Sequence, residues 1–182
     1  MPKLRQATIA DKQAIMKLYQ RVAQKEGGIA RIVAEITDNY ISAFVKKAIE
    51  EGIILVVEHP DKPSELIGEI HCYRPKIKIF AHIMSDLTIV VDPDFQGKGI
   101  GRLLFTTLIE EVEENHSDIL RIELFARESN THAIKFYEKL GFTIEGQFEN
   151  RVMGVKGLEA DIAMAWFNNN YKGKYSLTNK LK

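Results

Sequence analysis

The chain has 182 residues, of which 25 are basic and 25 acidic, so its formal net charge is +0. This length suits one domain with a sizeable core, and the balanced charge does not predict nucleic acid as a partner. The single cysteine, Cys72, excludes an internal disulfide and a cysteine-based zinc cluster, and we expect it to be buried in a strand. No apolar run approaches the roughly 20 residues of a membrane span, and no signal segment is visible. We therefore expect a cytoplasmic protein without a membrane partner.

The first third of the chain is expected to form a short strand followed by two helices. Leu4 to Ala7 fits a strand, and Asp11 fits the cap of a helix that ends at Gly27–Gly28. A second helix is expected between Thr37–Asp38 and Gly52. The apolar residues expected on the inner faces of these helices are Ile15, Leu18, Val22, Ile41, Phe44, Val45, Ala48 and Ile49.

The remaining elements predict a mixed sheet in an α+β (mixed α/β) fold. The expected strands are Ile53–Glu58, Leu66–Tyr73, Asp86–Val91, Leu120–Ala126, Phe142–Glu149 and Leu158–Phe167, the first two and the last two pairing antiparallel. Helices are expected over Gly99–His116 and Thr131–Leu140, with Gly141 as a left-handed cap. We assign residues 1–170 to one domain and residues 171–182 to a basic tail containing Lys172, Lys174, Lys180 and Lys182.

A glycine-rich loop follows the central strand. Gln96-Gly97-Lys98-Gly99-Ile100-Gly101-Arg102 comes after Pro93 and opens the helix on which Leu104, Leu108 and Val112 recur at helical spacing. Backbone N–H groups and the positive end of a helix dipole converge at such a place. The sequence therefore predicts a site for a phosphate or pyrophosphate.

The spacing of the glycines in this loop distinguishes it from two other nucleotide-binding motifs. Arg102 stands where a dinucleotide-binding fingerprint has its third glycine, and the Gly-Lys-Ser/Thr end of a Walker loop is absent. The loop instead resembles the acyl-coenzyme A motif Q/R-x-x-G-x-G/A of the GNAT N-acetyltransferase superfamily. The segment from Asn130 to Phe142 resembles the second motif of that family, N-x-x-A-x-x-x-Y-x-x-x-G-F. The likeness is strong from about Asp86 to Phe142, and it implies the GNAT acyl-CoA N-acyltransferase fold, a mostly antiparallel sheet flanked by helices.

The resemblance implies acetyl-coenzyme A as cosubstrate, with no metal. Backbone N–H groups of Gly97, Lys98, Gly99, Ile100, Gly101 and Arg102 would hold its pyrophosphate, and Gln96 would shape the loop. The backbone of Ile89, Val90 and Val91 would pair with the pantetheine arm, which Asn130 would contact from the other side. Tyr137 would stand near the thioester sulfur and donate a proton to the leaving thiolate. Taken without the resemblance, Asn130 reads as a helix cap and Tyr137 as a core aromatic residue.

Removal of a proton from the amine acceptor needs a base, for which the sequence offers three carboxylates. Asp86, expected to share a strand face with Thr88 and Val90, ranks first; Glu69 follows and Glu123 is third. Each of them alone reads more readily as a surface carboxylate. The family often has a glutamate at the position of Thr88, so the base does not carry over directly. His71 and His82 lie near the same strands, where a lone histidine is more often structural.

The expected reaction is acetyl transfer from acetyl-coenzyme A to a primary amine in a ternary complex. A non-catalytic acyl-coenzyme A sensor or partner-binding module on the same fold is the alternative, and a nucleotide-binding oxidoreductase is disfavoured by the loop spacing. We expect the acceptor to lie between Lys25–Asn39 and the loop after Phe142. A small amine and a protein N-terminus or lysine both fit, and a homodimer is compatible with the chain.

Overall fold

The computed structural model describes residues 2–25, 28–154 and 156–173. The chain folds into two compact units, each built from separate segments. The first unit combines Met1–Arg74 with Ser85–Leu108, and the second combines Pro75–Met84 with Ile109–Lys182. The continuous domain expected over residues 1–170 stays a prediction, and Lys174, Lys180 and Lys182 of the expected tail lie outside the described residues.

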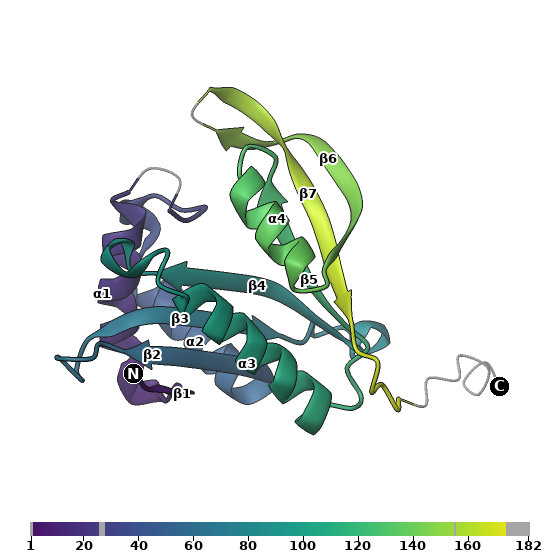
Figure 1. The fold of residues 1–182 in the computed structure, drawn as a ribbon, viewed down its shortest axis with the longest axis horizontal. Coiled ribbons are helices and arrows are strands. Elements are labelled where there is room, and N and C mark those ends of the chain that lie inside the picture. Colours follow the sequence, from purple (N-terminus) through teal and green to yellow (C-terminus); the bar gives the residue numbers. More distant parts are fainter. Residues whose placement is uncertain (1, 26–27, 155, 174–182) are drawn as a thin grey trace. The chain divides into compact units, whose positions relative to one another are not determined.

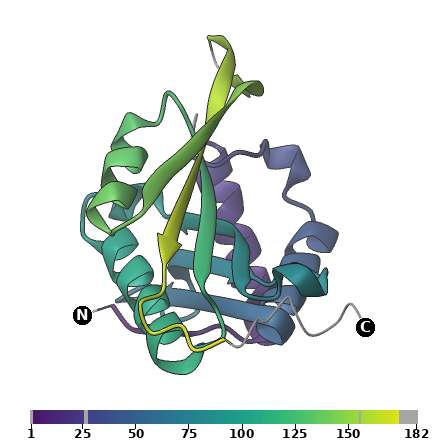
Figure 2. The same cartoon turned by 90° about the vertical axis from the view of Figure 1, so that its right-hand side faces the viewer.

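The first unit is an antiparallel sheet with helices on both faces. Its strands are β1 (Leu4–Gln6), β2 (Gly52–Glu58), β3 (Leu66–Tyr73) and the larger part of β4 (Ile83–Val91), paired in that order. Helices α1 (Lys12–Ala23) and α2 (Asp38–Glu51) cover one face, and the first half of α3 (Ile100–Asn115) covers the other (Figures 1 and 2). Short 3₁₀ turns occur at Ile9–Asp11, Val33–Glu35 and Pro93–Phe95.

Strand alternation divides the apolar side chains of this unit between the two faces. Ile54 and Val56 of β2 join a core with Ile15 and Leu18 of α1, all of them 4 % exposed or less. On the other face, a Cβ added at Gly68 would lie 2.8 Å from Cγ2 of Ile100, so α3 approaches β3 closely there. The same alternation places Glu69, His71 and Tyr73 on the face that α1 and α2 cover.

The second unit contains the start of β4, the end of α3, and the strands β5 (Arg121–Arg127), β6 (Thr143–Gly154) and β7 (Gly157–Phe167) with helix α4 (Thr131–Lys139). Strand β7 pairs antiparallel with both β5 and β6, whereas β5 runs parallel to the first residues of β4 at Ile83 and Met84. Helix α4 ends at Lys139, and Gly141, two residues further on, has a φ of +93°, which confirms the predicted left-handed cap. In the described residues, no helix is both long and apolar enough to span a bilayer.

Most of the expected elements are present, and the α+β class with its mixed sheet is confirmed. Strand β4 begins three residues earlier than expected, at Ile83, and β6 continues beyond Glu149 to Gly154 because its pairing with β7 extends that far. Ile49 is 43 % exposed rather than on the inner face of α2. Cys72 is buried as expected, and burial, with the charge of Glu69, raises the pKa of its thiol to about 12.

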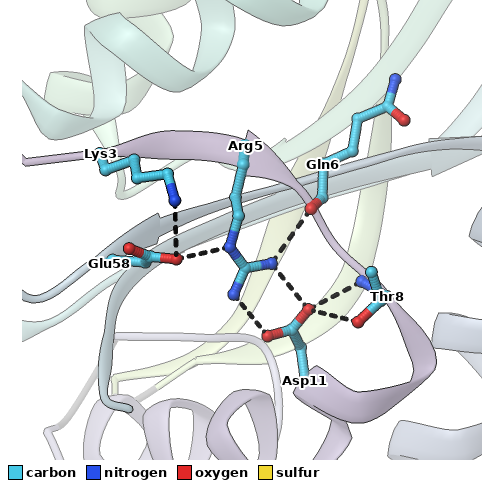
Figure 3. Close-up of polar contacts among 6 residues, drawn as sticks. All are labelled: Lys3, Arg5, Gln6, Thr8, Asp11 and Glu58. Atoms are coloured by element: carbon cyan, nitrogen blue, oxygen red, sulfur yellow. Dashed lines mark hydrogen bonds and ion pairs between the residues drawn. The ribbon is translucent and has the colours of Figure 1, made fainter. Parts of the chain in front are cut away.

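A cluster of charged side chains joins β1 to β2 and to the start of α1 (Figure 3). The Arg5 guanidinium donates two hydrogen bonds to the Asp11 carboxylate, at 2.7 and 2.8 Å, and Nε donates to Oε1 of Glu58 at 2.6 Å. The Asp11 side chain also accepts from the Thr8 N–H at 2.7 Å. Asp11 occupies the N-cap position of α1 as expected, but its side chain turns back toward Thr8 and makes no capping hydrogen bond to that helix. Hydrogen bonding from Arg5 lowers the pKa of Asp11 to about 2.

Replacing Arg5 with methionine should destabilise the protein by about 2 kcal/mol at neutral pH, since a carboxyl pKa lowered from 3.8 to about 2 corresponds to roughly that energy. The folded-state pKa is depressed, so this stability is present above pH 4 and is lost as the pH falls from about 4 to about 2. Urea unfolding of both proteins across this window measures the effect. The exposed Lys3, which is 3.9 Å from Glu58, is the control, and Lys3→Met should cost less than about 0.5 kcal/mol. Equal acid dependence in wild type and Arg5→Met would contradict the assignment.

Candidate functional site

The predicted anion loop lies between β4 and α3. Gly97 and Gly99 have φ values of +74° and +84°, a region that other residues rarely adopt, and a Cβ built on either would meet no atom within 4 Å. The Leu103 N–H donates to the Gly99 carbonyl at 3.0 Å. The N–H groups of Ile100, Gly101 and Arg102 therefore belong to the first turn of α3, where a helix has no carbonyl of its own to offer them. Open space beside free backbone donors fits a pyrophosphate.

The end of α1 holds the beginning of this loop. Arg21 donates from Nε to Oδ2 of Asp92 at 2.7 Å and from Nη2 to the Leu66 carbonyl at 2.8 Å. The other Asp92 oxygen accepts from the Asp94 N–H at 3.0 Å, which starts the turn at Pro93. Arg21 thus ties α1, β3 and the residue after β4 together, and positions the turn from which the loop departs.

Gln96 connects the loop to both of its neighbours. Its Nε2 donates to the Val91 carbonyl at 3.2 Å, and its Oε1 accepts from Nζ of Lys25 at 3.4 Å. The role of Gln96 in shaping the loop stays a prediction. Local sequence pattern does not mark the contacts of Arg21 and Lys25 with this region, because their partners Asp92 and Gln96 are 71 residues away in the chain.

Strand β4 leads into the loop with one edge paired. Residues Thr88, Ile89, Val90 and Val91 pair with β3, while the pairing with β5 covers only Ile83 and Met84 among the described residues. The register shifts between His71 and Tyr73, and Asp86 takes a φ of +54° at that bulge. The bulge interrupts the alternation of side chains along β4 at Asp86, so its place on the face of Thr88 and Val90 stays a prediction. Asp86 is exposed, and its charge adds to burial in raising the pKa of Tyr73 to about 12.

Glu69, the second candidate base, is fully buried on the α1–α2 face of β3. Its Oε2 accepts from the Tyr19 hydroxyl at 2.6 Å, and its Oε1 is 2.9 Å from Nδ1 of His71. Both carboxylate oxygens therefore already have partners within the protein. Val90 lies opposite Glu69 in the ladder, and Thr88 lies opposite His71.

The other three predicted residues belong to the second unit. Glu123 on β5 is partly exposed, with Oε1 2.9 Å from Nε of Arg121. Asn130 precedes α4 and accepts the Ala133 N–H on Oδ1 at 3.3 Å, so its oxygen serves as a helix cap. Tyr137 packs on α4 with its ring centroid 6.1 Å from that of Phe142, and burial raises the pKa of its phenol to about 12.

In this chain an open-edged strand is followed by a glycine loop at a helix N-terminus, an arrangement that suits an extended ligand ending in phosphate. Residues 13–142 match the model of the Acetyltransferase (GNAT) family, and the chain belongs to that family. The family assignment confirms the resemblance found in the sequence.

Several proteins with related sequences or structures are named as acetyltransferases. A [ribosomal protein bS18]-alanine N-acetyltransferase of Salmonella typhimurium is 42 % identical over 77 residues, which are 42 % of this chain and 51 % of that protein. A probable spermine N(1)-acetyltransferase of Bacillus subtilis subsp. natto is 36 % identical over 59 residues, covering 32 % and 38 %. The structure of yncA from Salmonella typhimurium, a putative acetyltransferase described with its cofactor acetyl-CoA, shares the fold at a TM-score of 0.78 and 21 % identity, covering 92 % and 94 %. The chain spans about half the length, or less, of the two sequence relatives.

Proposed function

We propose that this protein is an N-acetyltransferase that moves the acetyl group of acetyl-coenzyme A to a primary amine by direct transfer in a ternary complex. The observation that carries the proposal is the loop of Gly97 and Gly99, whose left-handed backbone opens onto the free N–H groups at the start of α3. Family membership supports the same cosubstrate. The pantetheine arm would run along the open edge of β4 at Ile89–Val91, adding its amides to that edge as a further strand would.

The residue roles follow from the chemistry that each side chain offers. Tyr137 is proposed to donate a hydrogen bond to the leaving thiolate, and the free nitrogen of Asn130 to contact the pantetheine arm. A backbone N–H near Val90 or Val91 would polarise the thioester carbonyl. Among the three carboxylates, Asp86 is exposed and makes no ion pair within the described part of the chain, so we propose that it meets the acceptor amine. Glu69 is enclosed and Glu123 faces Arg121, so we do not propose that either carboxylate contacts the acceptor directly.

The proposed acceptor is an amine. The relatives are named for a protein alanine and for spermine, so a protein N-terminus, a lysine and a small polyamine are all candidates. A cytoplasmic location, where acetyl-coenzyme A is available, and a homodimer belong to the same proposal.

Purified protein, acetyl-coenzyme A and two amine probes test the proposal. The probes are a peptide that begins with alanine and spermine, with thiol release and a mass increase of one acetyl group as the two readouts. Turnover with either probe would support the proposal. Coenzyme A binding without turnover for these probes and a wider amine panel would favour a non-catalytic acyl-coenzyme A sensor instead.

The Arg21 contacts predict a specific kinetic effect. Arg21→Met removes the hydrogen bonds to Asp92 and Leu66, so the loop loses its support and the Kd for coenzyme A should rise about 10-fold, equivalent to about 1.4 kcal/mol. The KM for acetyl-coenzyme A should rise similarly, with little change in kcat. Lys17→Met, at an exposed position of the same helix, is the control and should bind as wild type does. Calorimetry measures the Kd of both variants. Unchanged coenzyme A affinity in Arg21→Met would remove this residue from the site.

A further inference from the structure

Three buried polar side chains of the first unit form a hydrogen-bonded cluster that the proposed function has not used. Tyr19 on α1 is 0 % exposed, Glu69 is 0 % exposed and His71 is 2 % exposed. The Tyr19 hydroxyl is 2.6 Å from Oε2 of Glu69, and Nδ1 of His71 is 2.9 Å from Oε1. Enclosing a carboxylate is costly unless it is paired and hydrogen-bonded, so this cluster is a fixed arrangement and not an incidental contact.

The hydrogen bonds determine which nitrogen of His71 carries the proton. An ionised carboxylate only accepts, and burial together with Glu69 raises the pKa of Tyr19 well above its usual value, so the phenol keeps its proton and donates. The His71 nitrogen beside Oε1 must then be an N–H donor. This assignment leaves the lone pair on Nε2, which makes that atom the proton acceptor of the ring.

His71 lies on β3, beside the strand that leads to the anion loop. The ring is stacked on Phe44 at a centroid distance of 4.2 Å, with Tyr73 on the same strand at 5.8 Å, and Thr88 of β4 lies directly opposite in the ladder. Within the part of the chain that the structure describes, the hydrogen bonds of the ring are made at Nδ1 and none is found at Nε2. The His71 side chain is 3 % exposed.

We propose that His71, and not a carboxylate, accepts the proton of the acceptor amine, with Glu69 and Tyr19 as positioning residues. The inference rests on the proposed acetyl transfer. In that step the ammonium gives one proton to Nε2, directly or through one water. The amine nitrogen then forms a bond to the acetyl carbon as the carbon–sulfur bond breaks. The thiolate leaves with the electron pair of that bond, and the Glu69 carboxylate stabilises the resulting imidazolium.

Several titratable and charged groups surround His71 on this face of the sheet. Tyr19 approaches from α1, Tyr40 from α2, and Glu69 and Tyr73 from β3, while the charges of Asp86 on β4 and of Arg31 act on these tyrosines. Exposed Asp86 is suited to attracting a cationic acceptor, which affects binding. Enclosed His71 is suited to taking the proton, which affects the chemical step. The two residues should therefore separate in kinetics.

His71→Asn tests the proposal with spermine and the alanine peptide as acceptors. Asparagine can keep a donor near Oε1 of Glu69 but has no nitrogen at the place of Nε2. We expect kcat to fall by about 10²–10⁴-fold, with loss of the ionisation on the acidic limb of the rate profile. Asp86→Asn should instead raise the KM for the amine and keep that ionisation. The matched control is His116→Asn, because His116 also lies near a glutamate, with Nε2 3.7 Å from Oε1 of Glu111, and it should behave as wild type.

A measurement on the wild-type protein covers the case in which His71→Asn fails to fold. Nitrogen-15 NMR reports the tautomer of each histidine, and neutral His71 should carry its proton on Nδ1. A proton on Nε2, or a folded His71→Asn enzyme with the wild-type profile, would overturn the proposal. If the wild type transfers no acetyl group to any amine, the proposed function has failed instead.

Discussion

Replacing Gly99 with valine is expected to raise the Kd for coenzyme A by about 10–100-fold while the protein stays folded. Gly99 has a φ of +84°, where a branched side chain costs about 1–2 kcal/mol and pushes the backbone toward another conformation. A Cβ there meets no protein atom within 4 Å, so the added side chain enters the space that we assign to the pyrophosphate. Calorimetry with coenzyme A measures the loss. Pantetheine, which lacks the pyrophosphate, should bind the variant and the wild type equally.

A second glycine provides the matched control for backbone strain. Gly157, at the start of β7, has a φ of +121° and also has open space where its Cβ would be. Gly157→Val carries comparable strain outside the loop and should bind coenzyme A as the wild type does. If Gly99→Val is folded and binds with wild-type affinity, or if both valine variants lose affinity alike, the loop is not the pyrophosphate site.

Removing the hydroxyl of Tyr137 is expected to lower kcat about 10²-fold and to leave coenzyme A affinity unchanged. Tyr137→Phe keeps the ring that packs beside Phe142. The effect should lie at the low end of the range for positioned proton donors, because a phenol with a pKa of about 12 is a weaker acid than a thiol, whose pKa is about 8.5. Tyr137 should therefore stabilise the thiolate by a hydrogen bond that it retains, with complete proton transfer disfavoured.

The raised pKa of Tyr137 also has a consequence for the alkaline rate profile. The phenol stays protonated through neutral and mildly alkaline pH, so kcat should show no loss from its ionisation below about pH 10. Tyr171→Phe, which removes a hydroxyl near the end of the described chain, serves as the control and should leave kcat unchanged. Wild-type kcat in Tyr137→Phe would reduce Tyr137 to a packing residue of α4.

Local pattern was sufficient for the elements and for the two motifs of this chain. The bounds of β3 agree with the expected Leu66–Tyr73, and those of α3 and α4 agree within one residue. A strand, a glycine loop and a helix that follow one another in sequence also meet in space, so the anion loop needed no long-range information. Strand β6 was harder to delimit, because its length depends on its pairing with β7 and not on its own composition.

Residue roles on the strands depended on contacts between distant segments. The sequence ranks Asp86 and Glu69 as similar carboxylates on neighbouring strands, but the structure exposes Asp86 at a bulge and encloses Glu69 beneath Tyr19, 50 residues earlier. The structure also shows that His71, which looks like a lone strand histidine in the sequence, is hydrogen-bonded to the carboxylate of Glu69. A bulge shifts the alternation of side chains by one residue, and nothing in the local sequence of β4 announces it.

The sequence by itself therefore determined the family and the α+β class, and it located the candidate acyl-coenzyme A loop and the candidate Tyr137, since each depends on residues adjacent in the chain or on helical and strand periodicity. Only the tertiary structure decided that Arg21 supports the loop through Asp92 and that Glu69 and His71 share one buried cluster. Burial and hydrogen-bond partners arise where segments far apart in the chain pack together. Burial and hydrogen-bond partners decide which side chains are free to react, and neither can be read from the spacing of residues in the sequence.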